Sequence, residues 1–149
     1  MAKIKEIYTI RKEDNMDRKL TGYGEIALKA MCIIRNDKKS PQDAWEDASN
    51  EIFEAGSSSQ RKSCPKNSFL GLCEEGEIKG VKKGCYCKNI NNINKKYVID
   101  ALNLIRRDES LMNNKTNLWR KITDVSHNQQ LDVLFALIEE KYISLNSVP

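Results

Sequence analysis

The residue of this chain best suited to nucleophilic chemistry is Cys64, at the predicted start of a helix and close to Arg61, Lys62 and Lys66. Helix amides and nearby cations favour the reactive thiolate over the thiol. A nucleophilic cysteine also needs a base, and the chain contains one histidine, His127. Cys64 and His127 are therefore the candidate catalytic residues. The simpler interpretation, which we favour, makes Cys64 a half-buried packing residue and His127 part of a helix cap.

A basic segment is the second candidate for function. The net charge of the chain is only +4, yet nine basic and three acidic residues lie between positions 61 and 96. Such a local excess can attract polyanions more strongly than the total charge suggests. Its glycine-punctuated part predicts a nucleic-acid-binding site in which lysines contact phosphates and a tyrosine stacks on a base: Lys79, Lys82, Lys83, Tyr86 and Lys88. A solvated lysine-rich loop is the ordinary alternative.

Metal binding is the third possibility and the weakest. Four cysteines could supply thiolates to zinc: Cys64, Cys73, Cys85 and Cys87. Structural zinc sites use pairs separated by two to four residues, whereas one residue separates Cys85 from Cys87 and the others are far apart. Cys73 also falls on the apolar face of its predicted helix. We therefore predict no metal and no cofactor, and we find no phosphate-binding glycine loop or hydrolase motif.

Apolar residues at helical spacing predict the elements that must position these groups. In the first half, helices are expected after Thr21 to about Asn36, from Pro41 to Gly56 and from about Ser63 to Gly76. In the second half, they are expected from about Asn94, after Asn114–Thr116, and after a capping box at Ser126–Gln129. Gly71 is expected to mark a close backbone contact. Residues 77–88 alternate in a way that favours a short β-hairpin or wing.

The two halves of the sequence also resemble each other. Tyr23, Ala27, Leu28 and Trp45 recur 74 positions later, at Tyr97, Ala101, Leu102 and Trp119. The segment 69–78 is matched 65 positions later by 134–143. We therefore predict an all-α fold of about six helices, in which two three-helix units, 22–80 and 96–144, pack in one domain. The two tryptophans are expected to be core anchors rather than the walls of a ligand site.

Composition sets the broad class of the protein. A chain of 149 residues with 40% hydrophobic residues is sized for one soluble domain, 1–149, with residues 1–20 as an N-terminal arm. No apolar run is long enough to cross a membrane. The N-terminus has no apolar signal core, and the cysteine count, five, is odd. Both features predict free thiols in the cytoplasm.

Several motifs resemble those of a family of small uncharacterised bacterial proteins. They are Gly22-Tyr-Gly-Glu25, Pro41-x-x-Ala44-Trp45, Ser58-Ser-Gln60 and Cys64-Pro-Lys66-x-x-Phe69-Leu-Gly-Leu-Cys-Glu-Glu-Gly76-x-Ile78-Lys-Gly80. The tail pattern His127-Asn128, Gln130, Asp132-Val133 and Ala136-Leu137 is similar too, so the resemblance covers about residues 22–143. It implies a bacterial protein with a stable fold and carries no catalytic residue.

The sequence thus predicts a helical binding protein rather than an enzyme, with weak binding of DNA or RNA as its function. A protein–protein interaction or adaptor module is the alternative, and a cysteine-dependent enzyme is third.

Overall fold

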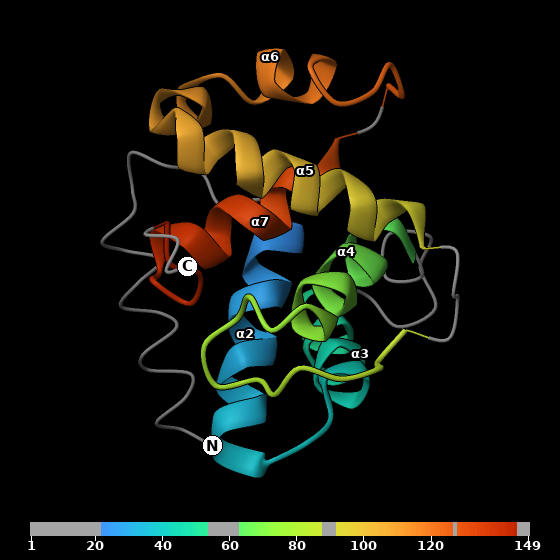
Figure 1. Ribbon diagram of the computed structural model, residues 1–149. Helices are drawn as coiled ribbons and strands as arrows, with labels where there is room; N and C mark the ends of the chain where they lie inside the picture. The colour runs from blue at the N-terminus through green and yellow to red at the C-terminus, as the bar shows by residue number, and fades with distance from the viewer. Residues whose placement is uncertain (1–21, 54–62, 88–91, 127, 146–149) are drawn as a thin grey trace.

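The computed structural model describes residues 22–53, 63–87, 92–126 and 128–145 (Figure 1). The predicted arm, residues 1–20, lies outside the described residues, as do Lys88 and His127. The described residues form six α-helices: α2 (Gly22–Asp37), α3 (Pro41–Ile52), α4 (Ser63–Glu74), α5 (Ile93–Arg107), α6 (Lys115–Arg120) and α7 (Gln129–Glu139). A 3₁₀ helix, Glu109–Asn113, joins α5 to α6. The described ranges contain no strand, which confirms the predicted all-α class.

Local sequence explains where most of these helices begin. The Ser40 side chain accepts a hydrogen bond from the Asp43 amide at 3.2 Å, and Pro41 occupies the first turn, as expected. Asn92 caps α5 and Asn114 caps α6 in the same way. The capping box predicted at Ser126–Gln129 is wrong, because α7 begins at Gln129 itself. Its N-cap, Asn128, makes no side-chain capping bond.

Helix α7 is the centre of the fold. It packs against α2, α4 and α5, while α2 also packs on α3 and α4 on α5 (Figure 1). Buried residues therefore occupy most of the circumference of α7: Gln130, Leu131, Val133, Leu134, Ala136, Leu137 and Ile138. A helix that is apolar nearly all round must lie in a core. None of the helices in the described ranges has the length and apolar character that a membrane span requires.

The turns after α4 and α7 are built alike. After α4, the Glu77 amide donates to the Leu72 carbonyl and the Gly76 amide to the Cys73 carbonyl. After α7, 65 positions on, the corresponding bonds run from the Tyr142 amide to the Leu137 carbonyl and from the Lys141 amide to the Ile138 carbonyl.

Both turns need a left-handed residue, and it is Gly76 in the first (φ 72°) and Lys141 in the second (φ 68°). Trp45 and Trp119 are both buried, as predicted. Helix α6 has 6 residues where α3 has 12. The likeness is therefore established at the turns, and the repeat of whole units stays a prediction.

Gly71 lies where α4 crosses α5. A Cβ built on it would be 2.5 Å from the Lys95 Cβ and 2.9 Å from the Lys95 Cα, so the predicted close contact is confirmed.

We expect Gly71→Ala to lower the free energy of unfolding by about 2 kcal/mol, because overpacking against a backbone atom outweighs the ~1 kcal/mol that alanine gains over glycine in a helix. Urea unfolding measures the change. A stabilised variant would show that α4 and α5 can move apart without cost.

Candidate nucleic-acid interface

The predicted basic segment forms a loop, residues 75–87, that runs from the end of α4 across the face of the molecule (Figure 1). It consists of turns and bends, so the β-hairpin proposed for this region does not form in the described part of it. The reason is a competing acceptor. The Glu74 carboxylate accepts hydrogen bonds from the amides of Tyr86 (2.8 Å) and Cys87 (2.7 Å), and the Glu74 carbonyl accepts one from Gly84. These amides are held by the end of α4.

Glu74 is a half-buried anchor for the loop. Burial by itself would raise the pKa of its carboxyl, but the amides of Cys87 and Tyr86 and the Lys95 ammonium outweigh burial and hold that pKa below its ordinary value. The Lys95 ammonium lies 3.1 Å from Glu74 and 3.0 Å from Glu75. The far end of the loop is therefore fixed to α4 and α5 by charged hydrogen bonds.

Tyr86 lies inside the loop. Its hydroxyl donates to the Lys82 carbonyl, and a Cβ built on Gly84 would lie 3.3 Å from that hydroxyl. Its carbonyl accepts a hydrogen bond from the Gln42 side chain of α3. The predicted stacking of Tyr86 on a base would require these contacts to open. In this structure the tyrosine instead supports the conformation of the loop.

Ion pairs divide the basic segment into paired and unpaired cations. Lys66 pairs with Glu46, Lys95 with Glu74 and Glu75, and Lys96 with Asp100. Arg61, Lys62 and Lys88 lie outside the described residues. Three lysines of the loop are exposed and have no ion pair within the described ranges: Lys79, Lys82 and Lys83. The remaining loop acid, Glu77, is held by Arg106 of α5 at 3.0 Å.

Two further cations join these lysines through Tyr142, and sequence reasoning missed both. The Lys79 amide donates to the Tyr142 carbonyl at 2.8 Å, the Arg35 guanidinium lies 6.0 Å from the Tyr142 ring centre, and Lys141 precedes Tyr142. Arg35 and Lys141 are exposed and have no ion pair within the described residues. We call the whole set the basic surface: Arg35, Lys79, Lys82, Lys83 and Lys141.

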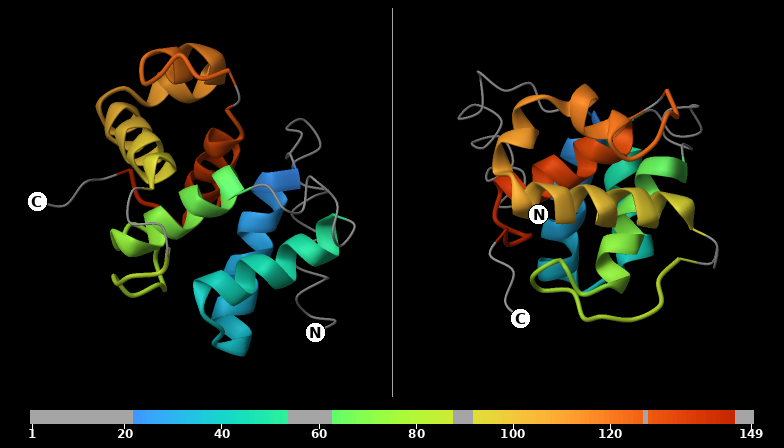
Figure 2. Two further views of the ribbon diagram at one scale, coloured as in Figure 1. Left: turned by 90° about the vertical axis from the view of Figure 1, so that its right-hand side faces the viewer. Right: turned by 45° about the horizontal axis from the view of Figure 1, so that its top comes forward.

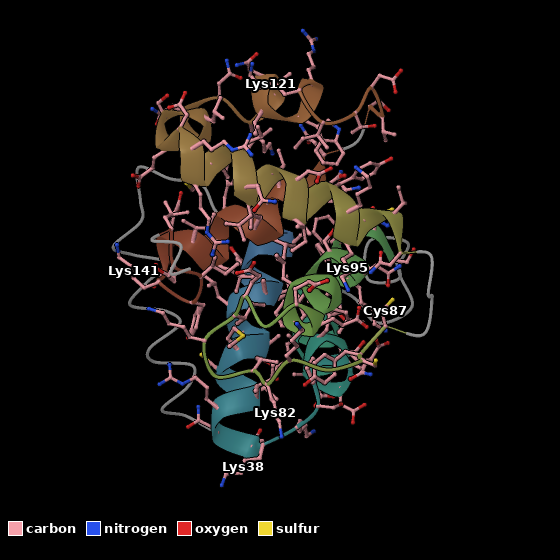
Figure 3. All side chains as sticks on the ribbon, viewed as in Figure 1. Lys38, Lys82, Cys87, Lys95, Lys121 and Lys141 are labelled. Carbon is pink, nitrogen blue, oxygen red and sulfur yellow. The ribbon has the colours of Figure 1, made fainter. Side chains whose placement is uncertain are left out.

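The loop that carries Lys82 lies away from α6, and Lys141 lies at the side of the molecule between the two (Figure 3). In Figure 3, Lys82 lies near the lower end of the molecule with Lys38, while Lys121, at the end of α6, lies at the upper end. Figure 2 shows the same separation between the loop and α6 in a second view. Arg120 and Lys121 of this distant region are likewise exposed and without an ion pair in the described part of the chain, so they provide a matched control.

The cysteines are all free thiols. Cys64 is half-buried in the first turn of α4, and the proposed pairing with His127 remains a prediction because His127 lies outside the described residues. Cys73 is fully buried, and burial raises the pKa of its thiol far above the ordinary value. No group of three or more metal-binding side chains comes together in the described ranges.

The two tryptophans belong to separate aromatic pairs. Trp45 packs on Phe69 with ring centres 5.2 Å apart, and Trp119 packs on Tyr97 at 5.3 Å. The Trp119 indole also donates to the Val125 carbonyl at 2.7 Å. They are core residues, as predicted.

A family model described as a family of unknown function, DUF6979, matches residues 20–144. Neither the comparison with curated proteins nor the comparison with solved structures finds a match.

Proposed function

Because the chain belongs to the family of unknown function DUF6979, its activity has to be inferred from its own surface, and we propose that it binds nucleic acid weakly through the 75–87 loop. The family match confirms the predicted membership of an uncharacterised family. The free thiols suit a reducing compartment, and we place the protein in a bacterial cytoplasm.

The observation that carries the proposal is the division of charge around the loop. Each acid that borders the lysines pairs with a cation of α5: Glu74 and Glu75 share Lys95, and Glu77 pairs with Arg106. Lys79, Lys82 and Lys83 form no ion pair with any acid of the described ranges. A positive potential therefore extends from the loop, and phosphates are the commonest polyanion that such a potential attracts.

The anchoring of the loop supports the same function. A flexible lysine-rich segment loses side-chain and backbone entropy when it binds. Here the backbone is already fixed by Glu74, Gln42 and the Tyr142 carbonyl. The lysines are thus presented from a prearranged backbone, which reduces the cost of binding.

The double variant Lys82→Glu, Lys83→Glu tests the proposal. We expect it to weaken binding of fluorescent nucleic acid at low salt by about a hundredfold or more, because two phosphate contacts become repulsive. Stability should change by less than about 0.5 kcal/mol, since both side chains are exposed. Fluorescence anisotropy and urea unfolding measure the two effects.

The matched control is Arg120→Glu, Lys121→Glu, which makes the same change in net charge at the distant end of the molecule. It should retain most of the wild-type affinity. Equal losses in the two variants would mean that total charge, not the loop, governs binding. If the wild type binds neither DNA nor RNA at tens of micromolar protein, the proposal fails and a protein partner becomes the better interpretation.

A further inference from the structure

We infer that the nucleic acid bound by the basic surface is a double helix, held by its phosphates alone and without base readout. This inference rests on the proposed function and specifies its ligand. Three features of the structure lead to it: the absence of an exposed aromatic ring from the described ranges, the internal partners of some polar residues that could read bases, and the placement of the unpaired cations.

The first feature is the lack of a stacking platform. Proteins that bind single strands stack successive bases on exposed aromatic side chains. None of the aromatic side chains in the described ranges is exposed, and the exposed large hydrophobic residue there is Ile93. Tyr86, the aromatic residue of the loop, is half-buried and hydrogen-bonded to the Lys82 carbonyl. A single strand would therefore find charge on this surface without the stacking that normally adds affinity.

The second feature is that three polar residues near the start of α4 and α7, Lys66, Asn67 and Gln130, have partners within the protein. On α4, Lys66 pairs with Glu46, and the Asn67 side-chain oxygen accepts from the Cys87 thiol at 3.5 Å. On α7, Gln130 is fully buried and donates to Asn94. Base recognition needs free amide or guanidinium groups that reach into a groove. The Lys66 ammonium and the Gln130 amide are therefore engaged within the protein.

The third feature is the origin of the cations. Arg35 comes from the last turn of α2, three lysines come from the loop, and Lys141 comes from the turn after α7. Lysines bind phosphates as point charges and carry little base information. The acids next to Lys141 in sequence, Glu139 and Glu140, are half-buried. A duplex offers one phosphate charge per ~1.7 Å of axis, about twice the density of a single strand, and so suits a surface that uses charge alone.

Fluorescence anisotropy with labelled 20-mers tests the inference. The probes are a DNA duplex, a second duplex of the same composition in shuffled order, an RNA duplex, and a single strand of thymidines. We expect the two DNA duplexes to bind within about threefold of each other and at least about tenfold more tightly than the single strand. The RNA duplex shows whether the surface also accepts the A-form spacing of phosphates.

Salt dependence counts the contacts. If all five cations contact phosphates, log Kobs should fall with log salt with a slope of about −4.5, or roughly 500-fold between 50 and 200 mM. Lys141→Gln should reduce the slope by about one unit, and its control Lys121→Gln should leave it unchanged. Vesicles containing phosphatidylserine are the control, because they present negative charge without nucleic acid.

The outcomes separate the inference from the proposed function. Binding of the thymidine strand as tightly as the duplex, or a preference above about tenfold between the shuffled duplexes, overturns the inference and leaves nucleic-acid binding intact. If Lys141→Gln leaves the slope of log Kobs against log salt unchanged, the turn after α7 does not contact the nucleic acid. The contact surface is then smaller than inferred. Absence of binding to all four oligonucleotides, or tighter binding to vesicles, overturns the proposed function itself.

Discussion

Replacing Trp45 with alanine is expected to lower the free energy of unfolding by about 3–5 kcal/mol, the usual cost of truncating a large buried aromatic residue. The Trp45 side chain is 2% exposed and packs on Phe69 across the α3–α4 contact. Truncation loses the free energy gained by burying the indole away from water, loses the aromatic contact with Phe69, and leaves a cavity. Urea unfolding followed by far-UV circular dichroism measures the loss.

Ile93→Ala is the control for Trp45, because Ile93 is 50% exposed and its truncation should cost less than about 0.5 kcal/mol. If Trp45→Ala costs less than about 1 kcal/mol, the indole does not anchor the core. The ligand-site interpretation of the tryptophans would then have to be reconsidered.

The second large effect is expected at Glu74. Glu74→Gln removes the charge that accepts hydrogen bonds from the Tyr86 and Cys87 amides and from Lys95, and it should lower stability by about 2–3 kcal/mol. The loop should open first, so amide hydrogen exchange at Tyr86 and Cys87 should quicken by roughly 30- to 150-fold. Glu75→Gln is the matched control, because Glu75 is exposed and pairs with Lys95 from the surface. Equal effects of the two substitutions would exclude an anchoring role specific to Glu74.

The same carboxylate makes loop stability depend on pH. The pKa of Glu74 is lower in the folded protein than its ordinary value of 4.5, because the hydrogen bonds from Cys87, Tyr86 and Lys95 outweigh the effect of burial. A lowered carboxyl pKa means that the stabilisation is complete above about pH 4.5 and is lost as the pH falls through the folded value. The protection of the loop amides against exchange, relative to the intrinsic exchange rate at each pH, should therefore fall below that pH in the wild type. In Glu74→Gln it should lack this pH dependence.

The helices could be predicted from the sequence because their signals are local. Apolar spacing defined the six helices, and Ser40-Pro41 marked the start of α3. The capping box at Ser126–Gln129 failed because the residues permit several starts, and tertiary packing of α7 selected one. The hairpin failed for a similar reason. Alternating residues in 77–88 suit a strand, but a carboxylate on the preceding helix captured the amides of Tyr86 and Cys87.

The candidate site could be predicted only in part. The sequence shows that lysines cluster, but it does not show which of them are neutralised. Lys95 appears as basic as Lys82 in the sequence, and yet Lys95 bridges Glu74 and Glu75 while Lys82 has no ion pair within the described ranges. Arg35 and Lys141 join the surface through Tyr142, a contact between the ends of α2 and α7 that no local pattern encodes. Pairing and convergence of charges are consequences of packing.

The central position of α7 has a consequence for how the protein is made. Helix α7 fills the space between α2, α4 and α5, and it is the last helix of the described chain to leave the ribosome. Until it emerges, the nascent helices α2 and α5 lack the surface that covers their apolar faces. Contacts between segments so far apart in sequence form slowly, and the uncovered faces are open to association with other chains meanwhile. The complete core can therefore fold only after α7 has been synthesised. A pause in synthesis before α7 would prolong the exposure of the apolar faces of α2 and α5.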